Sequence, residues 1–151
     1  MPLTPEDQAR ETIDRQLAQA GWVVQNVSAL NLHAGRGVAV RNLQTEHGPC
    51  DYMLFVDRQA VGILEAKREG AVLTNHELQP RKYSEGMPPG VPAPIKPLPF
   101  LYMSTGVETR FASLLDPDPR YRNLFHLHRP ETLAEWLARE PVWLPTSHRL
   151  V

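Results

Sequence analysis

Two carboxylates and a lysine stand at the ends of two neighbouring apolar segments of this 151-residue chain. Asp51 opens the apolar run 51–56, and Glu65 and Lys67 close the run 61–67. Because side chains alternate along a strand, Glu65 and Lys67 share a face. Two carboxylates that converge at strand ends make a hard oxygen site suited to Mg²⁺ or Mn²⁺. Such a metal polarises a phosphodiester and acidifies water. A lysine beside it can orient or activate that water.

The turn between the two segments decides whether the carboxylates meet. Directly opposed residues of an antiparallel pair point to the same face, so Asp51 and Glu65 share a face only if the loop has an odd number of residues or a bulge intervenes. A two-residue loop at Arg58-Gln59 would place them on opposite faces. We therefore expect a three-residue turn, or a bulge near residues 50–52 or 64–66. In the competing interpretation, Glu65 and Lys67 form an exposed ion pair and Asp51 is a turn residue.

The start of the chain predicts a helix over residues 5–20. Thr4 can cap it, Pro5 suits its first position, and Gly21 suits its end. Glu6 lies about two turns before the apolar Ile13, which places it on the inward face. A carboxylate there is either a cap or an additional metal ligand, and the sequence leaves both open.

The remaining pattern predicts an α/β or α+β fold with a mixed β-sheet flanked by helices. We expect further strands at 22–27, 37–43, 99–104 and 123–128, and helices at 74–85 and from 130 onward. The proline-rich stretch 88–99 is expected to be an extended surface loop. We assign one domain to residues 1–140 and a connector to residues 141–151.

Composition limits the function classes. The net charge of −1 lacks the basic excess of a free-standing nucleic-acid binder. The single cysteine, Cys50, excludes an intramolecular disulfide and favours a cytoplasmic setting. We interpret Cys50 as a small buried residue, and His126 and His128 as structural. The chain has no apolar run of about 20 residues and no signal-peptide pattern, so we expect no membrane association.

The chain resembles the N-terminal nuclease domain of the restriction subunit of type I restriction-modification enzymes. The matching stretches run almost from end to end, and together they are specific. They include residues 5–6, 9–10, 13–14, 20–22, 34–41, 51–52, 61–67, 99–102, 105–111 and 125–133.

The resemblance implies a restriction-endonuclease-like PD-(D/E)xK core in which Asp51, Glu65 and Lys67 occupy the motif positions. The proline of the motif is displaced to Pro49. Glu6 matches an acidic residue that such nucleases carry on the first helix and would assist in binding Mg²⁺. The pair Gln79 and Tyr83 matches a Gln-x-x-x-Tyr motif that contacts DNA or supports the site.

The resemblance also implies an endonuclease that cuts duplex DNA with the modification and specificity subunits of a type I complex. In the family an ATP-driven, helicase-like motor domain follows this one. The 151 residues contain no Gly-x-x-x-x-Gly-Lys-Ser/Thr loop, so ATP would act only through such a motor. Two alternatives stay open: a non-catalytic docking or DNA-binding module of the same fold, and a nuclease acting on RNA or single strands.

Overall fold

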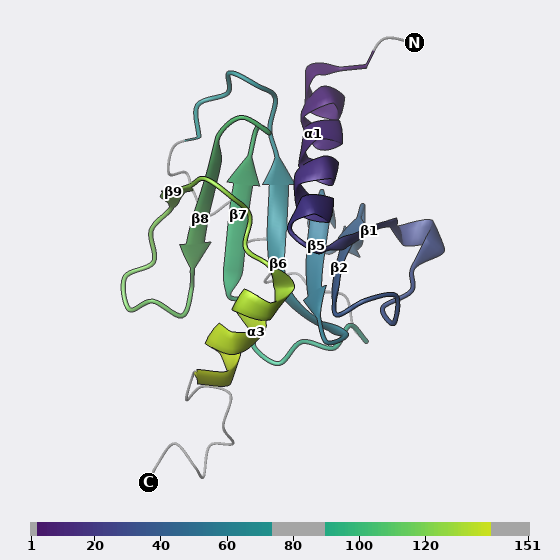
Figure 1. Cartoon of the computed structure of the whole chain (residues 1–151), viewed down its shortest axis with the longest axis vertical. Coiled ribbons are helices and arrows are strands. Elements are labelled where there is room, and N and C mark those ends of the chain that lie inside the picture. Colours follow the sequence, from purple (N-terminus) through teal and green to yellow (C-terminus); the bar gives the residue numbers. More distant parts are fainter. Residues whose placement is uncertain (1–2, 74–89, 140–151) are drawn as a thin grey trace, which may run out of the picture.

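The computed structural model describes residues 3–73 and 90–139, which build a seven-stranded mixed sheet with helices packed on it (Figure 1). The strand order is β1-β2-β5-β6-β7-β8-β9. The pairs β1–β2 and β6–β7 are parallel, and the other neighbours are antiparallel. The strands are β1 (Val23–Asn26), β2 (Gly37–Arg41), β5 (Tyr52–Val56), β6 (Gln59–Ala66), β7 (Phe100–Ser104), β8 (Thr109–Ser113) and β9 (Arg122–Leu124). The mixed α+β fold expected from the sequence is confirmed.

Helix α1 (Pro5–Gln19) forms where the sequence predicts it. Thr4 accepts a hydrogen bond from the amide of Asp7, and the Asp7 side chain accepts one from the amide of Thr4, so two amides at the helix start are satisfied. Gly21 follows the helix with φ of 96°, a conformation that glycine adopts without strain. The buried stripe of α1 consists of Ala9, Ile13 and Leu17.

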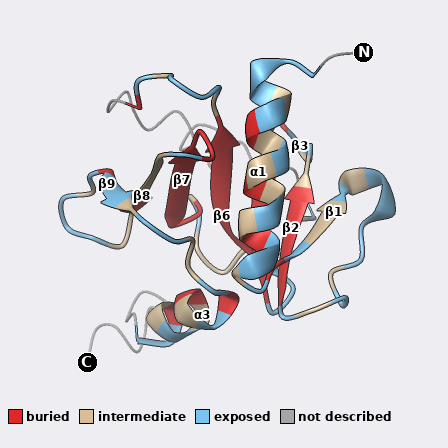
Figure 2. Ribbon diagram, turned by 45° about the horizontal axis from the view of Figure 1, so that its top comes forward, coloured by how far each residue is buried: buried red, intermediate tan, exposed pale blue. Residues whose placement is uncertain are grey.

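The described helices α1 and α3 (Pro130–Arg139) pack on one face of the sheet. Their buried side chains, such as Ile13 and Leu133, join one apolar cluster with Tyr52, Leu64 and other strand residues. Figure 2 shows buried strands on both sides of α1, with β6 and β7 on one side and β2 on the other. The opposite face carries a second cluster, which includes Met53 and Ile63 and is covered in part by Leu73, Leu98 and Tyr121.

Several sequence expectations need correction. The predicted strand 123–128 ends at Leu124, so His126 and His128 do not alternate on a strand. Strand β8 was not predicted, because its intermediate burial gives its sequence no clear apolar alternation. A short hairpin of β3 (Gln44–Thr45) and β4 (Gly48–Pro49) was also missed. A 3-10 turn, η1 (Val27–Ala29), follows β1.

The predicted helix at 74–85 lies outside the described residues, as does the connector 141–151. The proline-rich loop is described from residue 90. It runs without regular structure, and the carbonyl of Pro92 accepts a hydrogen bond from the amide of Ala60, which ties the loop to β6. Leu98 at its end is fully buried, so part of this loop belongs to the core. In the described part of the chain no helix has the length and apolar character needed to cross a bilayer.

Candidate active site

A β-bulge brings the predicted residues to the same side of the β5–β6 hairpin. The turn has two residues, Asp57 and Arg58, with φ of 50° and 68°. Near the turn Val56 pairs with Gln59, but further along Tyr52 pairs with Leu64, and the register shifts between Leu54 and Phe55. One extra residue of β6 therefore separates the two halves of the hairpin.

The bulge satisfies the parity condition in a different place from the one expected. The shift lies opposite Leu54 and Phe55, in the middle of the hairpin, and not near residues 50–52 or 64–66. Continuing the register one step beyond the Tyr52–Leu64 pair places Asp51 opposite Glu65. A two-residue loop is thus compatible with the site, because the bulge restores the shared face of Asp51 and Glu65.

Asp51 is fixed to the end of β6 by its side chain. Its Oδ2 accepts a hydrogen bond of 2.8 Å from the amide of Ala66, the residue between Glu65 and Lys67. The amide of Lys67 in turn donates to the carbonyl of Ser104 at 2.8 Å, so the motif stays aligned with β7. Asp51 therefore lies beside the Glu-Ala-Lys segment at a strand end that is held on both sides.

Glu65 and Lys67 interact directly. The Nζ of Lys67 lies 3.0 Å from Oε1 of Glu65, whose side chain is only 10% exposed. Burial opposes the charged form of Lys67, but the hydrogen bond to Glu65 and the nearby negative charges of Glu65, Asp51 and Glu6 outweigh it and raise the pKa of Lys67. Lys67 is therefore an ammonium ion placed against two largely buried carboxylates.

Arg10 of α1 is a site residue that the sequence analysis did not identify. Its NH2 lies 2.6 Å from Oδ1 of Asp51, and its NH1 lies 3.2 Å from Oδ1 of Asp7. Glu6 is 4.0 Å from the same NH2. The helical spacing of Glu6, Asp7 and Arg10 indicated that they share one side of the helix. Only the tertiary structure shows that Asp51 lies opposite them.

Glu6 lies at the edge of the site, where its charge acts on both Arg10 and Lys67. Its side chain is 55% exposed, so Glu6 is not buried in the core as an inward-facing residue would be. The capping role belongs to Thr4 and Asp7. Among residues 3–73 and 90–139, no three His, Cys, Asp or Glu side chains are grouped closely enough to hold a metal together. A ligand role for Glu6 stays a prediction.

A buried polar contact holds α1 against the strands next to the site. The hydroxyl of Tyr52 lies 2.6 Å from Oδ1 of Asp14 and 3.1 Å from the carbonyl oxygen of Arg10. Arg41 of β2 donates to Oδ2 of Asp14 at 2.9 Å. Burial and the hydrogen bond to Asp14 raise the pKa of Tyr52, so the hydroxyl remains a donor. The backbone of Arg10 is thus anchored independently of its side chain.

The remaining candidates from the sequence are either structural residues or lie outside the described part of the chain. Burial and the charge of Asp51 raise the pKa of the Cys50 thiol to about 12, which keeps it protonated and supports its interpretation as a packing residue. His128 accepts or donates a 2.7 Å hydrogen bond with the hydroxyl of Tyr102 in an aromatic cluster, as a structural residue would. Gln79 and Tyr83 lie outside the described residues.

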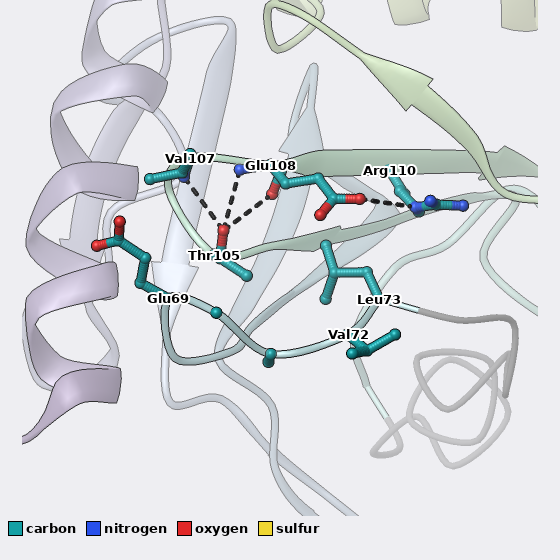
Figure 3. Close-up of a pocket in the computed structure, with 9 residues that line it drawn as sticks. Glu69, Val72, Leu73, Thr105, Val107, Glu108 and Arg110 are labelled. Atoms are coloured by element: carbon teal, nitrogen blue, oxygen red, sulfur yellow. Dashed lines mark hydrogen bonds and ion pairs between the residues drawn. The ribbon is translucent and has the colours of Figure 1, made fainter.

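A cavity of about 700 Å³ opens just past the Glu-Ala-Lys segment (Figure 3). It lies between the stretch Glu69–Leu73 and the β7–β8 turn, and it contains none of the predicted site residues. Thr105 accepts hydrogen bonds from the amides of Val107 and Glu108, and Glu108 pairs with Arg110. Thr105, Glu108 and Arg110 thus already have partners, and Glu69 is the third charged side chain that lines the cavity.

The donor set suits a divalent cation that takes oxygen ligands. Asp51 and Glu65 supply carboxylates that are 16% and 10% exposed, and each is paired with a cationic side chain, Arg10 or Lys67. Magnesium in proteins is commonly bound by one or two carboxylates, with water and substrate phosphate completing the shell. Two carboxylates at an open strand end fit this arrangement.

Comparison with known families gives one match. Residues 23–92 match the family described as "Type I restriction enzyme EcoKI endonuclease subunit second domain". The match covers just under half of the chain and includes β1 to β6 with Asp51, Glu65 and Lys67, but not α1. Neither the curated proteins nor the solved structures that were compared gave a match.

Proposed function

We propose, on the premise that residues 23–92 form a domain of the type I restriction endonuclease subunit family, that this chain is a metal-dependent nuclease domain that hydrolyses phosphodiester bonds of duplex DNA. The observation that supports this most directly is the convergence of Asp51 with the Glu65–Lys67 pair. The mid-hairpin bulge makes it possible, and the Asp51–Ala66 hydrogen bond maintains it.

Each residue has a distinct role in this proposal. Asp51 and Glu65 would hold Mg²⁺, or Mn²⁺ in its place. When bound, the ion would polarise the phosphodiester and lower the pKa of a coordinated water. Lys67 would orient the attacking water and offset charge on the phosphate. Gln79 and Tyr83 would contact DNA or support the site.

The near-neutral chain would obtain much of its DNA affinity from partners. The type I restriction enzyme family implies a multisubunit complex that acts on DNA. We propose that modification and specificity subunits choose the DNA sequence, and that a helicase-like motor of the same subunit uses ATP. Residues 1–140 would form the nuclease domain, and residues 141–151 would connect it to that motor.

Anomalous X-ray scattering from crystals soaked in Mn²⁺ tests the proposal without requiring turnover. We expect a peak roughly 2.0–2.6 Å from carboxylate oxygens of Asp51 and Glu65. Crystals of the Glu65→Gln variant should show a much weaker peak under the same soak. If crystals of the unaltered chain show no peak at these two residues, the metal-dependent mechanism is wrong, and the non-catalytic docking module becomes the better interpretation.

A further inference from the structure

The two carboxylate oxygens of Asp51 have different partners. Oδ2 accepts from the backbone amide of Ala66, a group that cannot leave without breaking the strand end. Oδ1 contacts NH2 of Arg10 at 2.6 Å, a side chain that is 34% exposed and attached to the first half of α1. A cation that binds Asp51 at Oδ1 meets only the mobile side chain of Arg10, whereas at Oδ2 it shares the oxygen with a fixed backbone amide. Oδ1 is therefore the oxygen at which a cation and Arg10 would compete.

Arg10 and a divalent cation would repel each other at this oxygen. Positive charges within a few ångströms of one another destabilise both, and partial burial weakens the screening that water would provide. The arginine cannot lose its proton to relieve the repulsion. Movement of Arg10 away from Oδ1 would relieve the repulsion.

Two other carboxylates lie within reach of the Arg10 guanidinium. Its NH1 already contacts Asp7, and Glu6 lies 4.0 Å from NH2. Its Nε is buried and has no hydrogen-bond partner within the described part of the chain, so its present position does not satisfy all of its donors. The backbone of Arg10 stays in place because Tyr52 and Asp14 anchor this turn of the helix.

We propose that Arg10 is a positioning residue that competes with a divalent cation for Oδ1 of Asp51 and withdraws toward Asp7 and Glu6 when the cation binds. This inference rests on the proposed metal-dependent function. Arg10 would keep Asp51 oriented and its charge compensated before metal binding. It would also set how tightly the site holds its metal.

The experiment is a titration of the full 151-residue chain with Mn²⁺ alone, followed by electron paramagnetic resonance of the free ion. Arg10→Gln removes the competing charge and should bind Mn²⁺ at least about tenfold more tightly, because the ion no longer has to displace a charge-assisted hydrogen bond from Oδ1. Arg15→Gln is the matched control, because it removes the same charge from an exposed position of α1. It should leave the affinity within about twofold of the unaltered chain.

A second variant keeps the test decisive if Arg10→Gln does not fold. Asp7→Asn removes the charge that receives Arg10, while the amide oxygen can still accept the capping hydrogen bond from Thr4. It should weaken Mn²⁺ binding, because Arg10 then remains with Asp51. Melting curves in EDTA would establish that each variant is folded.

The outcomes separate the two proposals. Tighter binding by Arg10→Gln, weaker binding by Asp7→Asn and no change in Arg15→Gln support the competition. Equal or weaker binding by a folded Arg10→Gln variant overturns it while leaving the metal site intact. Unchanged or tighter Mn²⁺ binding by the Asp7→Asn variant also overturns the competition and leaves the metal site intact. If the unaltered chain itself binds no Mn²⁺, both this inference and the proposed function are wrong.

Discussion

At the scale of single residues, the environment of Glu65 and Lys67 differs from that of an exposed ion pair. Glu65 is nearly buried, and its partner ammonium lies beside Asp51, whose side chain is fixed to the intervening Ala66 amide. A surface ion pair contributes little to stability and needs no such support. The arrangement supports the interpretation of these residues as active-site groups.

Replacing Lys67 by alanine should reduce cleavage of duplex DNA by at least about 10²-fold, as loss of one charge-stabilising donor does in other active sites. The assay uses the ATP-supplied complex that the proposed function implies. Lys96→Ala is the matched control, since Lys96 is exposed and distant in sequence from the site. Undiminished cleavage by a folded Lys67→Ala variant contradicts the assigned role.

At the scale of elements, the β5–β6 hairpin is the feature on which the site depends. Its tight turn uses Asp57 and Arg58 with positive φ, although neither is glycine. Asp57 is held by Arg36, which contacts its carboxylate at 3.1 Å and accepts its amide hydrogen bond through the Arg36 carbonyl. Gly62 allows β6 to approach β7, because a Cβ there would lie 2.6 Å from the carbonyl oxygen of Phe100.

The turn geometry makes a stability prediction. Arg58→Gly relieves an unfavourable left-handed conformation at an exposed position and should raise the free energy of unfolding by about 0.5–1 kcal/mol. Gln59→Gly, one residue later at the start of β6, should lower it by a similar amount, because glycine weakens a strand. Urea denaturation measures both. A destabilised Arg58→Gly variant would show that this turn does not hold its positive φ in solution.

At the scale of the whole molecule, an aromatic cluster joins the C-terminal helix to the sheet. His128 lies within 4.6–5.7 Å of the rings of Phe111, Trp136 and Tyr102, measured between centroids. Burial lowers the pKa of His128 to about 4, from an ordinary value of 6.5. The neutral imidazole is therefore the form that the folded chain favours.

This lowered pKa of His128 predicts that the free energy of unfolding falls at acid pH. The contribution of His128 is fully present above pH 6.5 and is lost as the pH falls from 6.5 toward 4, because the unfolded chain binds the proton first. The loss should be roughly 1–3 kcal/mol, allowing for partial exposure. His128→Gln should remove this part of the pH dependence in urea denaturation at pH 7 and pH 4.5, whereas His126→Gln, at an exposed position, should not. Equal pH slopes for the two variants would contradict the prediction.

The sequence by itself determined the first and last helices, the central strands and the resemblance that points to a nuclease. Caps, periodicity and the apolar runs 51–56 and 61–67 are local signals, and they were sufficient for these features. The alternation of side chains along the two strands also defined the condition that the hairpin had to meet. Strand β8 and the end of β9 were not predictable in this way, because their mostly half-buried or exposed residues show no apolar alternation. These segments become strands through hydrogen bonds to neighbouring strands.

Only the tertiary structure decided how the site is assembled. The position of the bulge depends on how β6 packs between β5 and β7, which no single segment encodes. The contact between Arg10 and Asp51 joins residues 41 positions apart, and it exists because α1 packs on the face of the sheet beside these strands. Charge compensation at a buried carboxylate is a property of the assembled fold, since the groups that supply it are distant in the chain.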